Sequence, residues 1–152
     1  MIETTQLRLG NYLSLSGSIA QVAAIHSESV CIEGVLRPTD NPQYPYEYNP
    51  ILASDDSLQP ILLSDFRLQH LAGSIPTAHG KAFLLKPGKA TYLIYPDKEN
   101  GGYFIGLDFR GELIRAIPRS FYNLHELQNI YYSIYRHELI MSDTKVRNIL
   151  NL

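Results

Sequence analysis

The sequence predicts an α+β fold with five parts: bent, SH3-like antiparallel strands at the N-terminus, a long Pro/Tyr loop, a short helix, a four-stranded antiparallel meander, and a C-terminal helix packed on the sheet. Short β-branched runs divided by Gly and Ser predict the first strands. Four apolar runs joined by turn residues predict the meander, and apolar residues at spacings of three and four predict the last helix. The 152 residues suit a single domain over 1–152, and a subdivision into 1–36 and 58–139 is the alternative.

The N-terminal strands are expected in the runs "NYLSLSG", "SIAQVAAI" and "SVCIEGVL". Each run holds β-branched residues or leucine and is bounded by Gly or Ser, as in an antiparallel meander. Three short, closely spaced strands predict a strongly bent sheet, and the comparison with SH3-like barrels is an analogy of fold. The single cysteine, Cys31, lies in the third run, where a small buried residue is expected.

A proline-rich segment, "RPTDNPQYPYEYNP", follows at residues 37–50. Its four prolines prevent a helix or a central strand, so we expect a long and partly extended loop. Its three tyrosines, Tyr44, Tyr46 and Tyr48, have two interpretations. They form an aromatic surface for a binding partner, or they pin the loop to the body of the domain.

The middle of the chain predicts a short helix followed by the meander. Ser64 suits the N-cap of this helix, Asp65 its first turn, and Gly73 its C-terminal end. Turn residues such as Pro87-Gly88 then divide the four expected strands, which are residues 81–86, 90–95, 103–109 and 112–117.

The stretch from Ser120 to about Arg136 predicts the C-terminal helix. Apolar residues recur there at helical spacing and form one stripe: Leu124, Leu127, Ile130, Tyr131 and Ile134. We expect this stripe to pack on the meander, because a sheet buries a face against such a helix. The tail from Ser142 to Leu152 suits another short helix.

The same stretch contains His-Glu twice, which raises the question of a zinc site. The zinc motif His-Glu-x-x-His places two ligands one helical turn apart. Here Asn129 occupies the second ligand position, and His137 lies about 18 Å along the helix from His125. We therefore predict no metal site, and the motifs indicate neither a cofactor nor a catalytic residue.

A polar face lies on this helix beside the apolar stripe. It contains His125, Gln128, Asn129 and Tyr132, and the amide side chains suit the reading of a base edge or a peptide backbone. The competing interpretation is that Gln128 and Asn129 satisfy backbone groups of an adjacent loop. An enzyme with a dispersed acid–base site around His125 is a third interpretation, and it requires a carboxylate within hydrogen-bond reach.

The net charge of −2 gives no overall signature for nucleic acid binding. The two halves differ, because residues 1–76 carry a net charge of −5 and residues 77–152 a net charge of +3. Two surfaces with different partners would produce this asymmetry, and so would chance. No apolar run approaches the ~18 residues that cross a membrane, and the start lacks the pattern of a signal peptide, so we expect a cytoplasmic protein without a membrane partner.

Three segments resemble a family of uncharacterised proteins from Bacteroidetes-type genomes and their prophages. The first is the Leu-Arg-Leu-Gly-Asn-Tyr stretch at residues 7–12 with the Ile-x-x-Val-x-x-Ile strand that follows it. The second is the run "QPILLSDFRLQHLAG". The third is the His-x-Leu-Gln-Asn-Ile-Tyr helix, which begins at His125 and ends in Glu138-Leu139. The resemblance implies a small cytoplasmic, phage-related protein and carries no known activity.

These observations together predict a non-catalytic interaction or accessory protein that binds protein or nucleic acid. A homo-oligomer is compatible with the sequence. The candidate binding residues are His125, Gln128, Asn129, Tyr132, Tyr44, Tyr46 and Tyr48.

Overall fold

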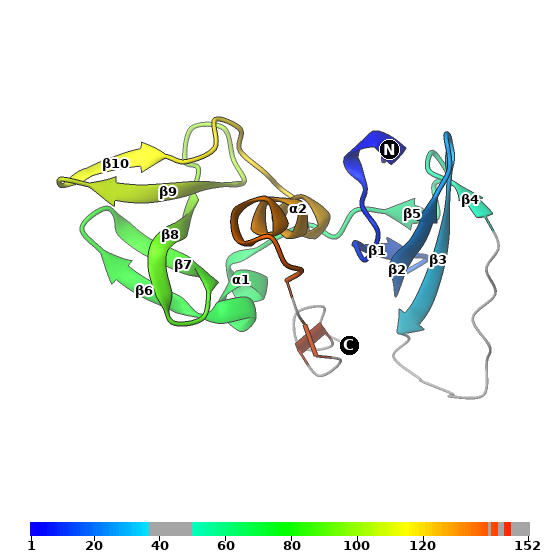
Figure 1. Cartoon of the computed structure of the whole chain (residues 1–152), viewed down its shortest axis with the longest axis horizontal. Coiled ribbons are helices and arrows are strands. Elements are labelled where there is room, and N and C mark those ends of the chain that lie inside the picture. Colours follow the sequence, from blue (N-terminus) through cyan, green and yellow to red (C-terminus); the bar gives the residue numbers. More distant parts are fainter. Residues whose placement is uncertain (37–49, 140, 143–144, 147–152) are drawn as a thin grey trace. The chain divides into compact units, whose positions relative to one another are not determined.

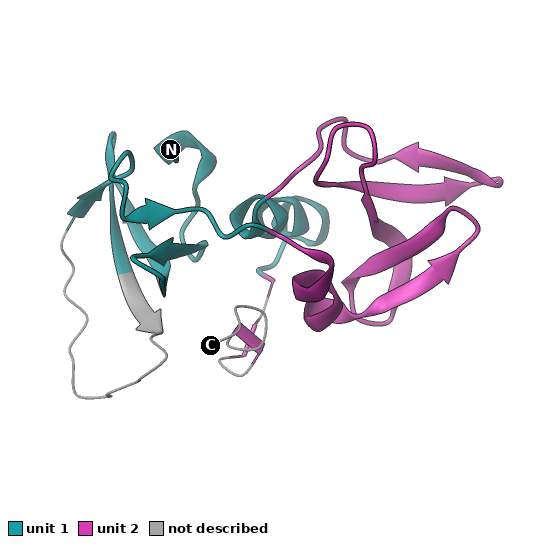
Figure 2. Ribbon diagram, turned by 180° about the vertical axis from the view of Figure 1, so that it is seen from behind, with its two compact units in different colours: residues 1–62, 123–138 teal, residues 63–122, 139–152 magenta. Residues whose placement is uncertain are grey.

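The computed structural model describes residues 1–36, 50–139, 141–142 and 145–146 (Figure 1). The chain divides into two compact units, which Figure 2 colours separately. Unit 1 consists of residues 1–62 and 123–138, and unit 2 of residues 63–122 and 139–152. Most of unit 2 is therefore inserted into the sequence of unit 1. These boundaries are not those of the subdivision considered from the sequence, because the C-terminal helix belongs with the N-terminal strands.

Unit 1 contains a five-stranded antiparallel sheet with the strand order β4-β3-β2-β1-β5. Its elements are η1 (Thr4–Gln6), β1 (Tyr12–Leu15), β2 (Ser18–Ile25), β3 (Ser29–Leu36), β4 (Pro50–Leu52), β5 (Leu58–Gln59) and α2 (Leu124–Tyr135). The first four strands form a meander, and β5 returns to the free edge of β1, which agrees with the bent, SH3-like arrangement that the sequence predicted. The prediction covered β1, β2 and β3 but not the two edge strands, which are only three and two residues long.

The core of unit 1 follows from the alternation of side chains along these strands. Residues two apart point to the same face of a strand, so Ala20 and Val22 of β2 face inward with Val30 and Ile32 of β3. The same cluster also contains Ile2, Leu7, Leu13 and Leu58. Cys31 is buried as expected, and its Sγ lies 3.8 Å from Nε2 of His26.

Unit 2 contains a second five-stranded antiparallel sheet, with the strand order β10-β9-β8-β7-β6. Its elements are α1 (Asp65–Ala72), β6 (Ser74–Thr77), β7 (Gly80–Lys86), β8 (Lys89–Pro96), β9 (Tyr103–Phe109) and β10 (Glu112–Arg115). The four predicted strands are all present, so the predicted meander is confirmed. The additional strand, β6, contains Pro76 and lies at the edge of the sheet, where a proline is tolerated.

Both faces of the second sheet bury apolar side chains. One face carries Phe83, Ile94 and Ile105 side by side. Tyr103 on the same face donates its hydroxyl to Asp65 at the start of α1, which places this helix against that face. The opposite face carries a separate core cluster of Ala82, Leu93, Tyr95 and Phe104, with Ile75, Leu84 and Leu113 at its margin.

The second sheet is strongly curled. Nε2 of His79, in the β6–β7 turn, lies 3.1 Å from Oδ2 of Asp108 on β9, although β8 separates β7 from β9 in the sheet. Figure 1 shows the β6–β7 and β9–β10 hairpins of this unit extending to the same side of β8. The curl brings these two hairpins together and helps to bury the cluster that contains Tyr95 and Phe104.

The chain passes between the two units in two antiparallel segments. Leu124 N–H donates to Ile61 C=O at 2.8 Å, and Leu63 N–H donates to Tyr122 C=O at 2.8 Å. Leu62 and Asn123 form an isolated β-bridge between these bonds. The two ends of the inserted residues 63–122 therefore lie next to each other.

Both predicted helices are present. The first has the predicted ends, whereas the second is shorter than predicted and contacts a different sheet. In α1, Ser64 is the N-cap, Asp65 lies in the first turn, and Gly73 follows the last turn with φ of 91°, as predicted. The second helix begins at Leu124 rather than at Ser120, because Phe121 forms a β-bridge with Tyr103.

The second helix, α2, also has a different sheet as its neighbour from the one expected. It belongs to unit 1 and contacts β1 there. Helical periodicity indicates that a face is buried and does not indicate which sheet covers it. The helix expected in the tail falls largely on residues outside those that the structure describes.

Candidate functional site

The side chain of Gln128 on α2 completes the hydrogen bonding of the neighbouring chain. Its Oε1 accepts the N–H of Tyr12 at 2.8 Å, and its Nε2 donates to the C=O of Gly10 at 3.1 Å. Tyr12 begins β1, and β5 pairs with that strand only at Ser14 and Leu15. The buried carboxamide therefore takes the place of a neighbouring strand where β5 is too short to cover the edge of β1.

Asn129 continues this contact through a second amide. Its Oδ1 accepts Nδ2–H of Asn11 at 3.0 Å, and its Nδ2 donates to the C=O of Gln6 at 2.9 Å. Asn11 is buried, and its Oδ1 accepts the N–H of Arg8 at 2.7 Å. Asn11, Gln128 and Asn129 thus form an amide network that joins α2 to the loop at residues 6–12.

Tyr132, the next predicted binding residue, lies one turn further along α2. The guanidinium of Arg8 covers its ring at 3.8 Å from the ring centre and pairs with Glu138 at 2.6 Å. The Leu-Arg-Leu-Gly-Asn-Tyr stretch at residues 7–12 and the Leu-Gln-Asn part of α2 are therefore two halves of one contact. This geometry agrees with the interpretation in which Gln128 and Asn129 satisfy a neighbouring loop.

His125, the remaining predicted binding residue on α2, lies outside the amide network. Its side chain is 2% exposed, and its Nδ1 has no hydrogen-bond partner among the residues that the structure describes. Burial lowers the pKa of the imidazole, with a smaller opposing effect from the neighbouring Glu126. Glu126 itself accepts the N–H of Asn123 at 2.9 Å as part of the helix N-terminus. Burial therefore favours the neutral imidazole, and among the described residues no carboxylate is bonded to His125 as the acid–base interpretation requires.

The aromatic part of the predicted binding site lies in the proline-rich segment. Tyr44, Tyr46 and Tyr48 fall outside the residues that the structure describes, so both interpretations of these side chains stay predictions.

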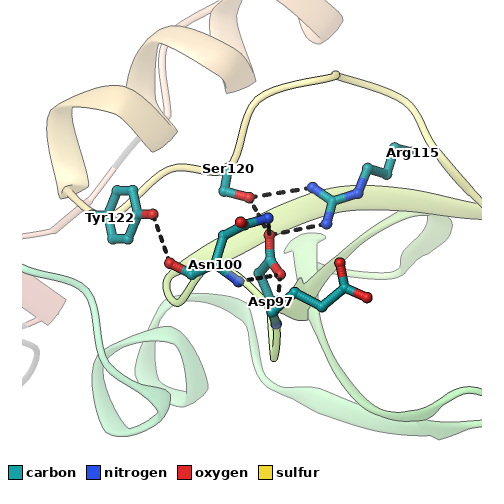
Figure 3. Close-up of polar contacts among 6 residues, drawn as sticks. Asp97, Asn100, Arg115, Ser120 and Tyr122 are labelled. Carbon is teal, nitrogen blue, oxygen red and sulfur yellow. Dashed lines mark hydrogen bonds and ion pairs between the residues drawn. The ribbon is translucent and has the colours of Figure 1, made fainter.

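A buried carboxylate in unit 2 was not predicted. Asp97 follows β8 and is 5% exposed, and its Oδ1 accepts the N–H groups of Glu99 and Asn100 at 3.1 Å each. Its Oδ2 accepts Nη2–H of Arg115 at 2.9 Å and the hydroxyl of Ser120 (Figure 3). These bonds tie the β8–β9 turn to β10 and to the segment that leads back to unit 1.

The same turn depends on a glycine. Gly102 has φ of 69°, and a Cβ there would lie 2.6 Å from the backbone oxygen of Phe121 and 2.7 Å from the ring of Tyr122. Tyr122 in turn donates its hydroxyl to the C=O of Asn100 at 3.0 Å (Figure 3). Only a residue without a side chain allows this close approach.

The bonds around Asp97 determine what this carboxylate can do. The Ser120 hydroxyl, the Arg115 guanidinium and the backbone N–H of Asn100 together hold the pKa of Asp97 well below its ordinary value. A carboxylate of such low basicity, with both oxygens already engaged, is a poor general base. We interpret the cluster as a structural tie. Residue spacing could not reveal it, because the β9–β10 hairpin separates Asp97 from Arg115 and Ser120 in the sequence.

In the described part of the chain, no group of three or more His, Cys, Asp or Glu side chains is arranged to hold a metal ion. Neither described helix is long and apolar enough to cross a membrane.

The charge asymmetry follows the two units more closely than it follows the two halves of the sequence. Unit 1 holds three basic and nine acidic residues, a net charge of −6, whereas unit 2 holds ten basic and six acidic residues, a net charge of +4. Among the described residues of unit 2, the exposed cations are Lys81, Lys89, Lys98, Arg110, Arg115 and Arg119. Of these, Arg115 is paired with Asp97.

Comparisons with known proteins add no assignment to this description. No protein-family model, no curated protein and no solved structure matches the chain.

Proposed function

We propose that the protein is a non-catalytic binding protein in which unit 2 contacts nucleic acid. The observation that carries this proposal is the segregation of charge, with a net charge of +4 on unit 2 and −6 on unit 1. A positively charged unit attracts a phosphate backbone and releases its counterions. An acidic unit in the same chain restricts that attraction to one part of the molecule.

The polar contacts within the units support a binding role over a catalytic one. The amides of Gln128 and Asn129 are engaged with the loop at residues 6–12, so they do not offer a free polar face for recognition. Asp97 is likewise engaged on both oxygens. Apart from Arg115, which is paired with Asp97, the exposed cations of unit 2 are available to contact a phosphate backbone.

The experiment uses the full chain and fluorescein-labelled oligonucleotides of DNA and RNA, single-stranded and double-stranded. Binding is followed by fluorescence anisotropy between about 50 and 200 mM salt. We expect binding that weakens steeply as salt rises, with a logarithmic slope of roughly 0.7 to 0.9 for each phosphate contacted. The double variant Lys89→Glu/Lys98→Glu should bind more weakly, because it reverses two cations of unit 2.

The matched control is Asp56→Asn, which changes an exposed residue of unit 1 and leaves the cations of unit 2 unchanged. This variant should bind at least as well as the unaltered protein. Absence of binding to every oligonucleotide at the lowest salt contradicts the proposal. A protein that stays bound in a nuclease-treated pull-down, together with that absence, would identify a protein partner instead.

A further inference from the structure

The β9–β10 hairpin of unit 2 carries apolar side chains that are exposed. Phe109 is 53% exposed and Ile114 is 40% exposed, while Leu107 is half-buried. The strand register places Leu107 opposite Ile114, and Phe109 lies two residues further along the same face. These three residues, termed the hairpin patch below, form a contiguous apolar surface at the end of the hairpin.

The turn of this hairpin contains an unusual residue. Arg110 and Gly111 form a two-residue loop between the paired Phe109 and Glu112, and both loop residues have positive φ, 54° and 85°. Glycine, asparagine and aspartate are the residues that favour such a turn, because a larger side chain is strained there. The β1–β2 turn of unit 1 has the same form with a small residue, Ser16, before Gly17.

An arginine at this strained position places a cation beside the hairpin patch. The guanidinium of Arg110 lies 5.2 Å from the ring centre of Phe109, and both residues are exposed. Glycine or asparagine would form this turn with less strain than Arg110, and backbone strain that is retained in this way is typical of functional positions. An exposed aromatic ring beside a guanidinium can stack on a base and contact a phosphate at the same time.

We propose that the hairpin patch, with Arg110, is where unit 2 binds single-stranded nucleic acid. A base stacks on the ring of Phe109, and the guanidinium of Arg110 contacts the adjoining phosphate. A single strand is the occupant because its bases are free to leave the stack, whereas those of a duplex are not. The net charge of +4 on unit 2 complements this ligand, and the inference rests on the function proposed above.

Two acidic residues lie near Arg110. Asp108 is already engaged, because it accepts the N–H of Gly111 at 2.9 Å and pairs with His79 at 3.1 Å. Glu112 is exposed and lies opposite Phe109, on the same face, where it opposes an approaching phosphate. The variant Glu112→Gln should therefore bind single strands more tightly than the unaltered protein.

The test compares variants of the full chain in their affinity for a fluorescein-labelled oligothymidine at low salt. Arg110→Asn and Phe109→Ala should each weaken binding by about fivefold or more, because each removes one stacking or phosphate contact. The matched control, Arg136→Asn, makes the same substitution at an exposed arginine that also has positive φ but belongs to unit 1, and it should change affinity by less than about twofold. Arg110→Asn should also raise the thermal midpoint, because asparagine tolerates positive φ.

The outcomes separate this site from the function on which it rests. If the unaltered protein binds no oligonucleotide, both proposals fail. If it binds and the two hairpin variants match Arg136→Asn, unit 2 binds through its other cations and the hairpin patch is not the site. If a duplex binds more tightly than oligothymidine, stacking on Phe109 is not the mode of binding.

Discussion

Replacement of Gln128 by methionine tests whether the amide network holds α2 to the loop at residues 6–12. Methionine has a similar length and keeps the apolar contacts, but it removes the bonds to Tyr12 N–H and Gly10 C=O. Each bond contributes about 1 kcal/mol to the free energy of unfolding, and a buried polar group that loses its bond adds roughly 1–2 kcal/mol. Gly10 C=O keeps a bond from Gln21 Nε2 at 3.1 Å, which reduces the loss. We expect a destabilisation of about 2–4 kcal/mol.

The assay is urea unfolding combined with amide hydrogen exchange on assigned residues. Exchange separates the two units, and the Tyr12 amide reports directly on the bond to Gln128. The matched control is Ser133→Ala on the same helix, where an exposed hydroxyl bonds Ile130 C=O, and we expect a change below about 0.5 kcal/mol. A loss below about 1 kcal/mol for Gln128→Met, with Tyr12 exchange unchanged, would refute the reasoning.

Three further predictions concern the buried imidazole, the buried carboxylate and the inserted unit. His125→Leu should leave stability at pH 7 unchanged or raise it by about 1 kcal/mol, since the unpaired Nδ1 is removed. The lowered pKa of His125 means that the unfolded chain binds more protons than the folded chain, so the free energy of unfolding decreases as pH falls below about 6.5. In His125→Leu this free energy should depend less on pH in that range. The same pH profile in both proteins would argue against the burial effect. Asp97→Asn should lower the thermal midpoint at pH 7. The lowered pKa of Asp97 gives stability that is present above about pH 4 and lost as pH falls further, so the midpoints of the two proteins should converge in acid, and parallel curves would contradict this. Finally, joining Leu62 to Asn123 through two glycines should give a folded unit 1 with a protected Tyr12 amide, and an unfolded product by circular dichroism would show that unit 1 depends on the insertion.

Local signals predicted the elements that local physics determines. Ser64 and Gly73 marked the ends of α1 because capping and positive φ depend on a few neighbouring residues. The four strands of the meander were predicted because turns such as Pro87-Gly88 separate them. The strands that were missed, β4, β5 and β6, are short edge strands that form only because a longer strand offers a free edge.

The candidate site was harder to predict, because its contacts join distant parts of the chain. The sequence identified Gln128 and Asn129 as part of a polar face beside the apolar stripe of the helix, and one interpretation was that they bond an adjacent loop. It could not show that their partners lie at residues 6–12. Most of these bonds go to backbone groups, which every residue type carries, so the partner residues have no recognisable sequence pattern. For the same reason, nothing in the sequence linked Asp97 to Arg115 and Ser120.

The insertion of residues 63–122 has a consequence for the order of folding during synthesis. Those residues emerge from the ribosome before α2, and their first and last members lie side by side, so this part of unit 2 has most of its contacts available early. Unit 1 cannot form its amide network until Gln128 and Asn129 have been synthesised, because these residues bond positions more than one hundred residues earlier in the chain. Closing so long a loop costs less entropy when its interior has already folded into a compact body with adjacent ends. The early folding of the inserted residues would thus shorten the search by which α2 finds the start of the chain.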